Sequence, residues 1–227
     1  LPLRTLTTRL SLFAGLLAAS VAAHAQIYTV SKTNSIDAVL DSASFDRVFT
    51  FGAGDIVAPG LSVIDVNISV NFAKLPGDSD ELSVPPSGPF SGQPYFDEIA
   101  FTLTYVNSGT SINLIRQRFE VQAFSQFFSG TILFDDSAAN VVNVDLDQIQ
   151  IGSFQPIDPL QAFYGQAFVP GSWTLGLNDF AAGDALRFYE ATLTVTYAAV
   201  PEPSTYGLIG AGILAGLVAF RRFRAKK

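Results

Sequence analysis

Three stretches of the sequence alternate apolar and polar residues with a period of two, and this pattern constrains the fold most. In residues 64–72 every even position is apolar and every odd position polar, while 99–105 and 191–197 carry their large apolar residues at odd positions. Alternate side chains of a strand point to opposite faces, so each stretch predicts a strand with one buried and one solvated face. Such strands are typical of antiparallel sheets packed on one side.

Weaker strand patterns complete an all-β prediction. They lie near residues 47–52, 112–122, 131–134, 141–150 and 172–177. Residues 26–200 show no sustained helical period, and their number suits one domain. We therefore predict an antiparallel β-sandwich or jelly roll of about eight strands.

A proline-rich stretch at residues 74–94 interrupts these strands. It contains five prolines, which cannot donate the backbone hydrogen bonds of a sheet, and it therefore predicts a long loop. A loop of this kind on a β scaffold either binds a ligand or is a surface loop with no binding role.

Charge and composition exclude several classes of function. Residues 26–200 hold 19 acids and six bases, a net charge of −13, whereas the segments before and after them are basic. Such an acidic domain repels phosphates, so we expect no nucleic-acid partner. The chain has no cysteine, and its one histidine, His24, lies in the N-terminal segment. Disulfides, Ser-His-Asp triads and histidine-ligated metals are therefore excluded from a chain that begins at residue 26.

Residues 1–25 have the pattern of a secretory signal peptide. Two arginines precede a ten-residue apolar run, and the small residues Ala23 and Ala25 predict cleavage by signal peptidase before Gln26. The alternative, an amphipathic surface helix, would require a polar face that the apolar run lacks.

The C-terminal segment 201–227 carries three features in order: Pro201, Glu202 and Pro203, then an apolar stretch at about 204–220, then a basic tail that begins with Arg221 and Arg222. The apolar stretch predicts one short transmembrane helix of marginal length for a bilayer. The positive-inside rule places the basic tail in the cytoplasm and the acidic domain outside.

This order of features resembles the PEP-CTERM sorting signal of Gram-negative bacteria. The resemblance implies processing by an exosortase near the Pro-Glu-Pro triplet, anchoring in the inner membrane during transit, and then delivery to the cell surface or the extracellular space. It also implies an association with exopolysaccharide and biofilm. Two prolines would hold the cleavage site extended and outside the helix. The alternative is an ordinary single-pass anchor with a proline-containing stalk.

The end of the β domain resembles the P domain, also called Homo B, that follows subtilisin-like proprotein convertases. The resemblance rests on residues 163–166, 170–179, 182–186 and 193–195, with looser matches at 97–103, 108–110 and 134–138. It covers about residues 48–198 and implies a non-catalytic eight-stranded β-sandwich. Ser172 replaces the usual threonine, the glycine common after Asp184 is absent, and so is the histidine common near Phe72.

The sequence around Trp173 predicts core packing on physical grounds alone. Trp173, Leu175 and Leu177 alternate on one face of their strand. A solvent-exposed platform for carbohydrate stacking is the alternative for this tryptophan. Farther along the chain, Gly183 and Asp184 predict a turn in which the aspartate caps nearby backbone amides.

Carboxylates are the only reactive groups that this composition leaves. Weak candidates for oxygen ligands to Ca²⁺ are Asp135 and Asp136, Asp145 and Asp147, and the acidic run at 77–81. The alternative for each cluster is a solvated surface, so we commit to no metal and to no cofactor.

These observations favour an exported, non-catalytic surface or matrix protein. One alternative is a calcium-dependent adhesion or polysaccharide-binding module. Another is a carboxylate hydrolase, because two carboxylates at a suitable separation suffice for glycoside hydrolysis.

Overall fold

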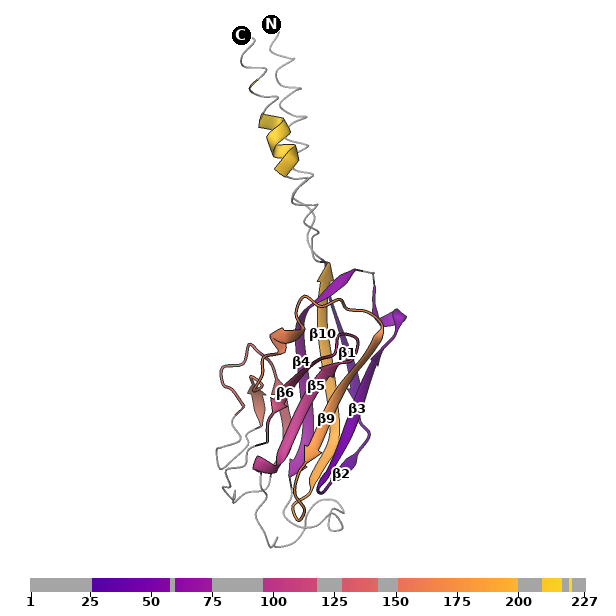
Figure 1. Ribbon diagram of the computed structural model, residues 1–227, viewed down its shortest axis with the longest axis vertical. Coiled ribbons are helices and arrows are strands. Elements are labelled where there is room, and N and C mark those ends of the chain that lie inside the picture. The colour runs from indigo at the N-terminus through magenta and orange to yellow at the C-terminus, as the bar shows by residue number, and fades with distance from the viewer. Residues whose placement is uncertain are drawn as a thin grey trace. The chain divides into compact units, whose positions relative to one another are not determined.

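A computed structural model describes residues 26–57, 60–74, 96–117, 128–142, 151–199, 210–217 and 221. The chain divides into two compact units. One is formed by residues 28–198, and the other by the two ends, 1–27 and 199–227. The unit of residues 28–198 is built of strands and short 3₁₀ turns (Figure 1). In the C-terminal segment residues 210–217 form a helix.

The first sheet has the strand order β1-β10-β4-β7-β8, and β2 pairs with β10 beside this path. Its strands are β1 (Ile27–Asn34), β2 (Ala38–Leu40), β4 (Leu61–Lys74), β7 (Phe128–Phe134), β8 (Gly152–Phe154) and β10 (Leu186–Ala199). The β4–β7 pair is antiparallel, whereas β7 and β8 run parallel.

The second sheet has the order β3-β9-β5-β6 and is antiparallel throughout. Its strands are β3 (Ala43–Phe51), β5 (Ile99–Tyr105), β6 (Thr110–Ile115) and β9 (Gly171–Asp179). The 3₁₀ turns are η1 (Ala53–Asp55), η3 (Phe96–Glu98) and η4 (Leu160–Phe163). In Figure 1 the strands of this sheet lie in front of β10, β4 and β1.

One hydrophobic core joins the two sheets, as the alternation predicts. In β5 the residues Ile99, Phe101, Leu103 and Tyr105 are buried while the threonines between them are partly exposed, and the same holds for the odd positions 191–197 of β10. The all-β sandwich is therefore confirmed. Apolar burial of this kind contributes about 25 cal/mol per Å² and is the main force that holds two such sheets together.

The prediction for residues 64–72 is correct except at its first residue. Val63 and Val66 are fully buried, whereas Ile64 is 36% exposed. The buried face of β4 therefore changes from odd to even positions between these residues, as an extra residue in a strand requires. The first part of β4 bonds to residues 165–168 and the second part pairs with β7.

Trp173 packs in the core rather than on the surface. It is 1% exposed, and its ring stacks on Tyr105 at a centroid distance of 4.4 Å and meets Phe163 edge-on at 4.8 Å. Leu175 and Leu177 are buried on the same strand. The core prediction for this segment is confirmed.

The strand predictions also missed some elements. Strands β1, β2 and β8 were not predicted, so the described residues contain ten strands rather than about eight. Of the predicted strand at 141–150, only Val141 and Val142 are described, and Val141 forms an isolated bridge with Gln155. Lys74, the first residue of the predicted loop at 74–94, instead ends β4, and the rest of that stretch lies outside the described residues.

Candidate functional site

Asp135 and Asp136, two of the weak calcium candidates, directly follow β7 and organise the backbone around them. The Oδ1 atom of Asp135 accepts a hydrogen bond of 2.7 Å from the amide N–H of Ser137. The two carboxylate oxygens of Asp136 accept bonds of 2.9 and 2.7 Å from the amides of Leu160 and Gln161. Asp136 thus caps the start of η4, whose own preceding residue is a proline that provides no side-chain cap.

An open cavity of about 490 Å³ lies beside these aspartates. Its lining consists of polar side chains, namely Asp65, Asn67, Asp135, Asp136, Ser137, Gln161 and Tyr164. Its residues Asp65 and Asn67 lie in the part of β4 between the bonds to residues 165–168 and the pairing with β7. The sequence pattern did not identify this site, because its residues come from three separate segments.

Two hydrogen bonds join three of the side chains in this polar cavity. The hydroxyl of Tyr164 donates to Asp65 Oδ1 at 2.9 Å, and the amide of Asn67 donates to Asp65 Oδ2 at 2.9 Å. Burial, and then the bond to Asp65, raise the pKa of the Tyr164 hydroxyl above its ordinary value. The tyrosine is therefore a neutral donor, and the cavity offers mainly acceptors to a ligand.

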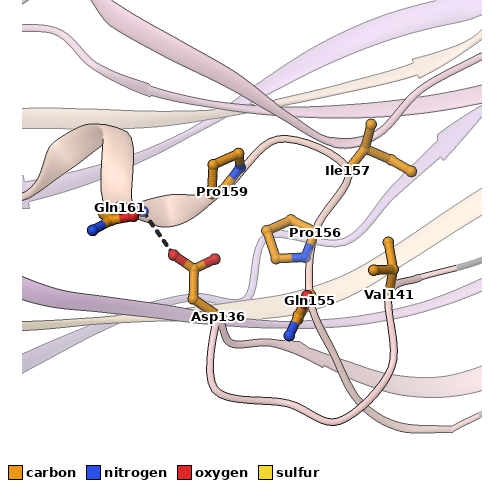
Figure 2. A pocket seen from close by; sticks show the side chains of 7 residues that line it. All are labelled: Asp136, Val141, Gln155, Pro156, Ile157, Pro159 and Gln161. Carbon is orange, nitrogen blue, oxygen red and sulfur yellow. Dashed lines mark hydrogen bonds between the residues drawn. The ribbon is translucent and has the colours of Figure 1, made fainter.

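A second cavity, of about 300 Å³, adjoins the first, because Asp136 and Gln161 line both. Figure 2 shows Pro156, Pro159, Ile157 and Val141 around it, together with the bond between Asp136 and Gln161. The two cavities form one surface on which polar and apolar side chains alternate.

The described part of the chain does not contain a set of side chains arranged to bind Ca²⁺. Within it, no group of three or more acidic, histidine or cysteine side chains is arranged to hold a metal ion. Asp145, Asp147 and the acidic run at 77–81 lie outside the described residues.

A buried charge cluster lies at one end of the sandwich and was not predicted from the sequence. Lys74, at the end of β4, is fully buried, and its Nζ atom lies 2.9 Å from Asp179 Oδ2, 3.2 Å from Asp184 Oδ2 and 3.6 Å from Glu98 Oε2. The same Nζ donates a hydrogen bond to the backbone carbonyl of Asp184. The cluster thus holds one lysine amine and three carboxyl groups, and its residues come from both sheets.

Burial changes the ionisation of these acids. It is the largest cause that raises the pKa of Glu98 to about 8, and a hydrogen bond with Asp184 adds to it. Burial also raises the pKa of Asp179 to about 6 despite the neighbouring Lys74, and it raises the pKa of Asp97. At neutral pH the cluster therefore holds at least one carboxyl proton.

The chain bends at residues 181–183, beside the predicted turn at 183–184, and Asp184 takes part in this cluster. Gly183 has a φ of +105°, which favours glycine, and its amide donates to Asp41 Oδ1 at 2.9 Å. The Asp184 carboxylate lies beside Lys74 and is nearly buried. The one sequence feature that could have indicated this cluster is a lysine at the end of an apolar strand. The sequence alone does not reveal which acids surround that lysine.

At the C-terminus, residues 210–217 are helical and Arg221 is exposed. The rest of the predicted helix at about 204–220, the Pro201, Glu202 and Pro203 triplet and Arg222 lie outside the described residues, as does the predicted signal peptide. Among the described residues, no helix has the length and apolar character needed to cross a bilayer.

Comparison with known families identifies this C-terminal segment. Residues 199–224 match the PEP-CTERM protein-sorting motif. A PEP-CTERM motif indicates an exported protein that crosses a Gram-negative inner membrane and is processed by an exosortase. The matched residues include the triplet, the helix and the Arg221–Arg222 pair that the sequence singled out.

The comparisons give no further family for the β domain. No curated protein matches this chain. Among solved structures, the Aeromonas sobria serine protease in complex with its chaperone ORF2 is 11% identical with a TM-score of 0.43. The match covers 82% of this chain and 30% of that chain. The VP2 subviral particle of infectious bursal disease virus is 10% identical with a TM-score of 0.23, over 89% and 49% of the two chains. This chain thus spans less than half of either structure's length.

Proposed function

We propose that this PEP-CTERM protein is a non-catalytic component of the cell surface or extracellular matrix, associated with exopolysaccharide or biofilm. The observation that carries the proposal is the sorting motif at 199–224, which begins where β10 ends. A sandwich exported in this way reaches the compartment in which exopolysaccharide accumulates.

Composition supports a role in binding or structure rather than catalysis. From residue 26 onward the chain has no histidine or cysteine, so its available chemistry is that of carboxylates and hydroxyls. Both oxygens of Asp136 already bond to backbone amides. The resemblance of residues 48–198 to the non-catalytic P domain agrees with this view and remains a hypothesis that rests on the sequence segments.

The test of sorting replaces Pro201, Glu202 and Pro203 with alanine in a host that carries an exosortase. We expect the variant to remain in the membrane fraction at its unprocessed size, because the recognised triplet is lost. A variant with Pro85→Ala and Pro86→Ala controls for loss of prolines elsewhere and should be processed normally. Normal processing and release of the triple-alanine variant would refute exosortase sorting.

The adjoining cavities favour a second candidate function, which is polysaccharide binding by the β domain. Carboxylate and amide groups interspersed with the apolar side chains Val141, Pro156 and Ile157 suit the hydroxyl groups and the apolar ring faces of a sugar. Calorimetry of the purified protein with soluble glycans, with and without Ca²⁺, tests this candidate. Asp65→Asn should weaken binding, whereas the exposed Asp46→Asn, on the other sheet, should not. If calorimetry detects no binding heat with any of the glycans, this function would be contradicted.

A further inference from the structure

The cluster around Lys74 joins the two sheets through a pair of fully buried side chains. Lys74 ends β4 in the first sheet, and Asp179 ends β9 in the second, 105 residues farther along the chain. Neither side chain is exposed to solvent, and Nζ lies 2.9 Å from Asp179 Oδ2. A lysine amine and an aspartate carboxyl group are thus held in contact where water does not separate them.

The surroundings exclude water from both groups. Taking charges out of water disfavours an ammonium ion as well as a carboxylate, so a buried pair has access to the amine and the carboxylic acid. Glu98, with Oε2 at 3.6 Å from Nζ, provides a third group that can exchange a proton with the amine. Its hydrogen bond with Asp184 keeps a carboxyl proton inside the cluster.

The geometry also polarises the Asp179 carboxyl group. Its Oδ2 atom accepts a hydrogen bond of 3.0 Å from the backbone amide of Leu186 in addition to the bond from Lys74. A fixed N–H donor of this kind stabilises the negative charge that develops on a carboxyl oxygen when a nucleophile attacks its carbon.

We propose that Lys74 and Asp179 form an intramolecular isopeptide bond, with Glu98 as the residue that transfers the protons. The neutral amine of Lys74 attacks the Cγ carbon of protonated Asp179, and a new C–N bond forms. Glu98, which holds a proton at neutral pH, delivers that proton to the hydroxyl oxygen of the Asp179 carboxyl group and takes one from Nζ in its place. That C–O bond breaks, and one water molecule leaves. The reaction needs no oxidant and no cofactor.

Such a bond would serve a cysteine-free exported protein as a disulfide serves others. The chain has no cysteine, so it cannot link its sheets through sulfur. An amide between β4 and β9 would join them covalently and leave the net charge unchanged, because one positive and one negative group disappear together.

The pair formed by Lys32 and Asp55 provides a matched control within the same molecule. Its Nζ and Oδ1 atoms lie 2.8 Å apart, but the two side chains are 35% and 24% exposed. The hydrogen bond from Lys32 lowers the pKa of Asp55, so this pair stays ionised and accessible to water. We expect it to remain an ion pair.

Mass spectrometry of the full chain tests the proposal. We expect an intact mass about 18 Da below the mass calculated for the same N- and C-termini, because one water is lost. Trypsin does not cleave after an acylated lysine, so digestion should give a branched product of residues 48–116 and 119–187, with fragment ions that place the bond at Lys74 and Asp179. Cleavage after Lys32 should be normal.

A Glu98→Gln variant tests the proton transfer. Glutamine has nearly the size of a protonated glutamate, so the variant should fold, as the fluorescence of the single tryptophan, Trp173, can verify. We expect it to lack the bond and to be about 17 Da heavier than the wild-type protein. An unmodified wild-type chain, or a bond at Asp184, would overturn the proposal. A bond that still forms in folded E98Q would overturn the role of Glu98.

Discussion

At the scale of single residues, Glu98 makes the stability of the domain depend on pH. Its pKa rises from 4.5 to about 8 in the folded protein, chiefly because the side chain is buried. Between these values the folded state binds more protons than the unfolded state. The stabilisation is therefore complete below pH 4.5 and is lost as the pH rises toward 8. This effect persists in a domain with the isopeptide bond, because burial, and not Lys74, raises the pKa.

We predict that the free energy of unfolding of the wild-type domain falls between pH 5 and pH 8, because Glu98 must lose its proton inside the fold over this range. Denaturant unfolding at several pH values, followed by Trp173 fluorescence, measures the slope. Glu98→Gln should reduce the slope, whereas Glu190→Gln, at an exposed position of β10, should leave it unchanged. E98Q also lacks the isopeptide bond, so Asp179 titrates only in the variant, up to about pH 6. An equally steep slope in E98Q between pH 6 and pH 8 would therefore contradict the assignment.

At the scale of elements, short turns and edge strands depend on partners that are distant in the sequence. The cap of η4 comes from Asp136, 24 residues before the turn. Strand β1 lies along β10 through three hydroxyl pairs, which are Thr29 with Thr196, Ser31 with Thr194 and Thr33 with Thr192. The outward-facing threonines of β10 thus have a structural use that the alternation alone did not indicate.

Asp136→Ala should destabilise the domain by about 0.5–2 kcal/mol, the usual cost of losing a helix cap, because the amides of Leu160 and Gln161 lose their acceptor. Thermal and denaturant unfolding measure the change. Asp46→Ala removes an exposed aspartate and should change stability by less than about 0.5 kcal/mol. Equal stabilities of the two variants would show that the capping bonds contribute nothing measurable.

At the scale of the whole molecule, the strands and the sorting segment belong to separate compact units. The buried core residues lie between Leu40 and Ala198, inside the unit of residues 28–198. The strongly acidic charge belongs to the same part of the chain, and the basic charge belongs to the ends. Such a charge favours solubility and attraction to cations outside the cell.

We predict that a fragment of residues 26–200 folds alone, because it contains the whole described core. Its unfolding midpoint should equal that of the full chain in detergent, and Trp173, which is 1% exposed, should show blue-shifted fluorescence in both. Trp173→Phe removes the signal and identifies its source. A fragment with tryptophan emission like that of an unfolded chain would show that the ends are needed for folding.

Local patterns in the sequence determined the fold class and the sorting signal. Alternation fixes which face of a strand is buried, so β4, β5, β9 and β10 and the buried position of Trp173 could be predicted from it. Strand β1 could not, because its inward positions are only partly buried and include Lys32 and Asn34, and because its partner β10 is distant in the sequence. The sorting motif is likewise contiguous, so its residues were recognisable without a structure.

Only the tertiary structure decided which distant side chains meet. Lys74, Glu98, Asp179 and Asp184 come from four places in the chain, and no local pattern relates them. The cavity that includes Asp65, Asp135 and Tyr164 arises in the same way, from segments that the sheet pairing brings together. The physical reason is that alternation and composition act over a few residues, whereas contacts between charged groups depend on strand order and on the packing of the two sheets.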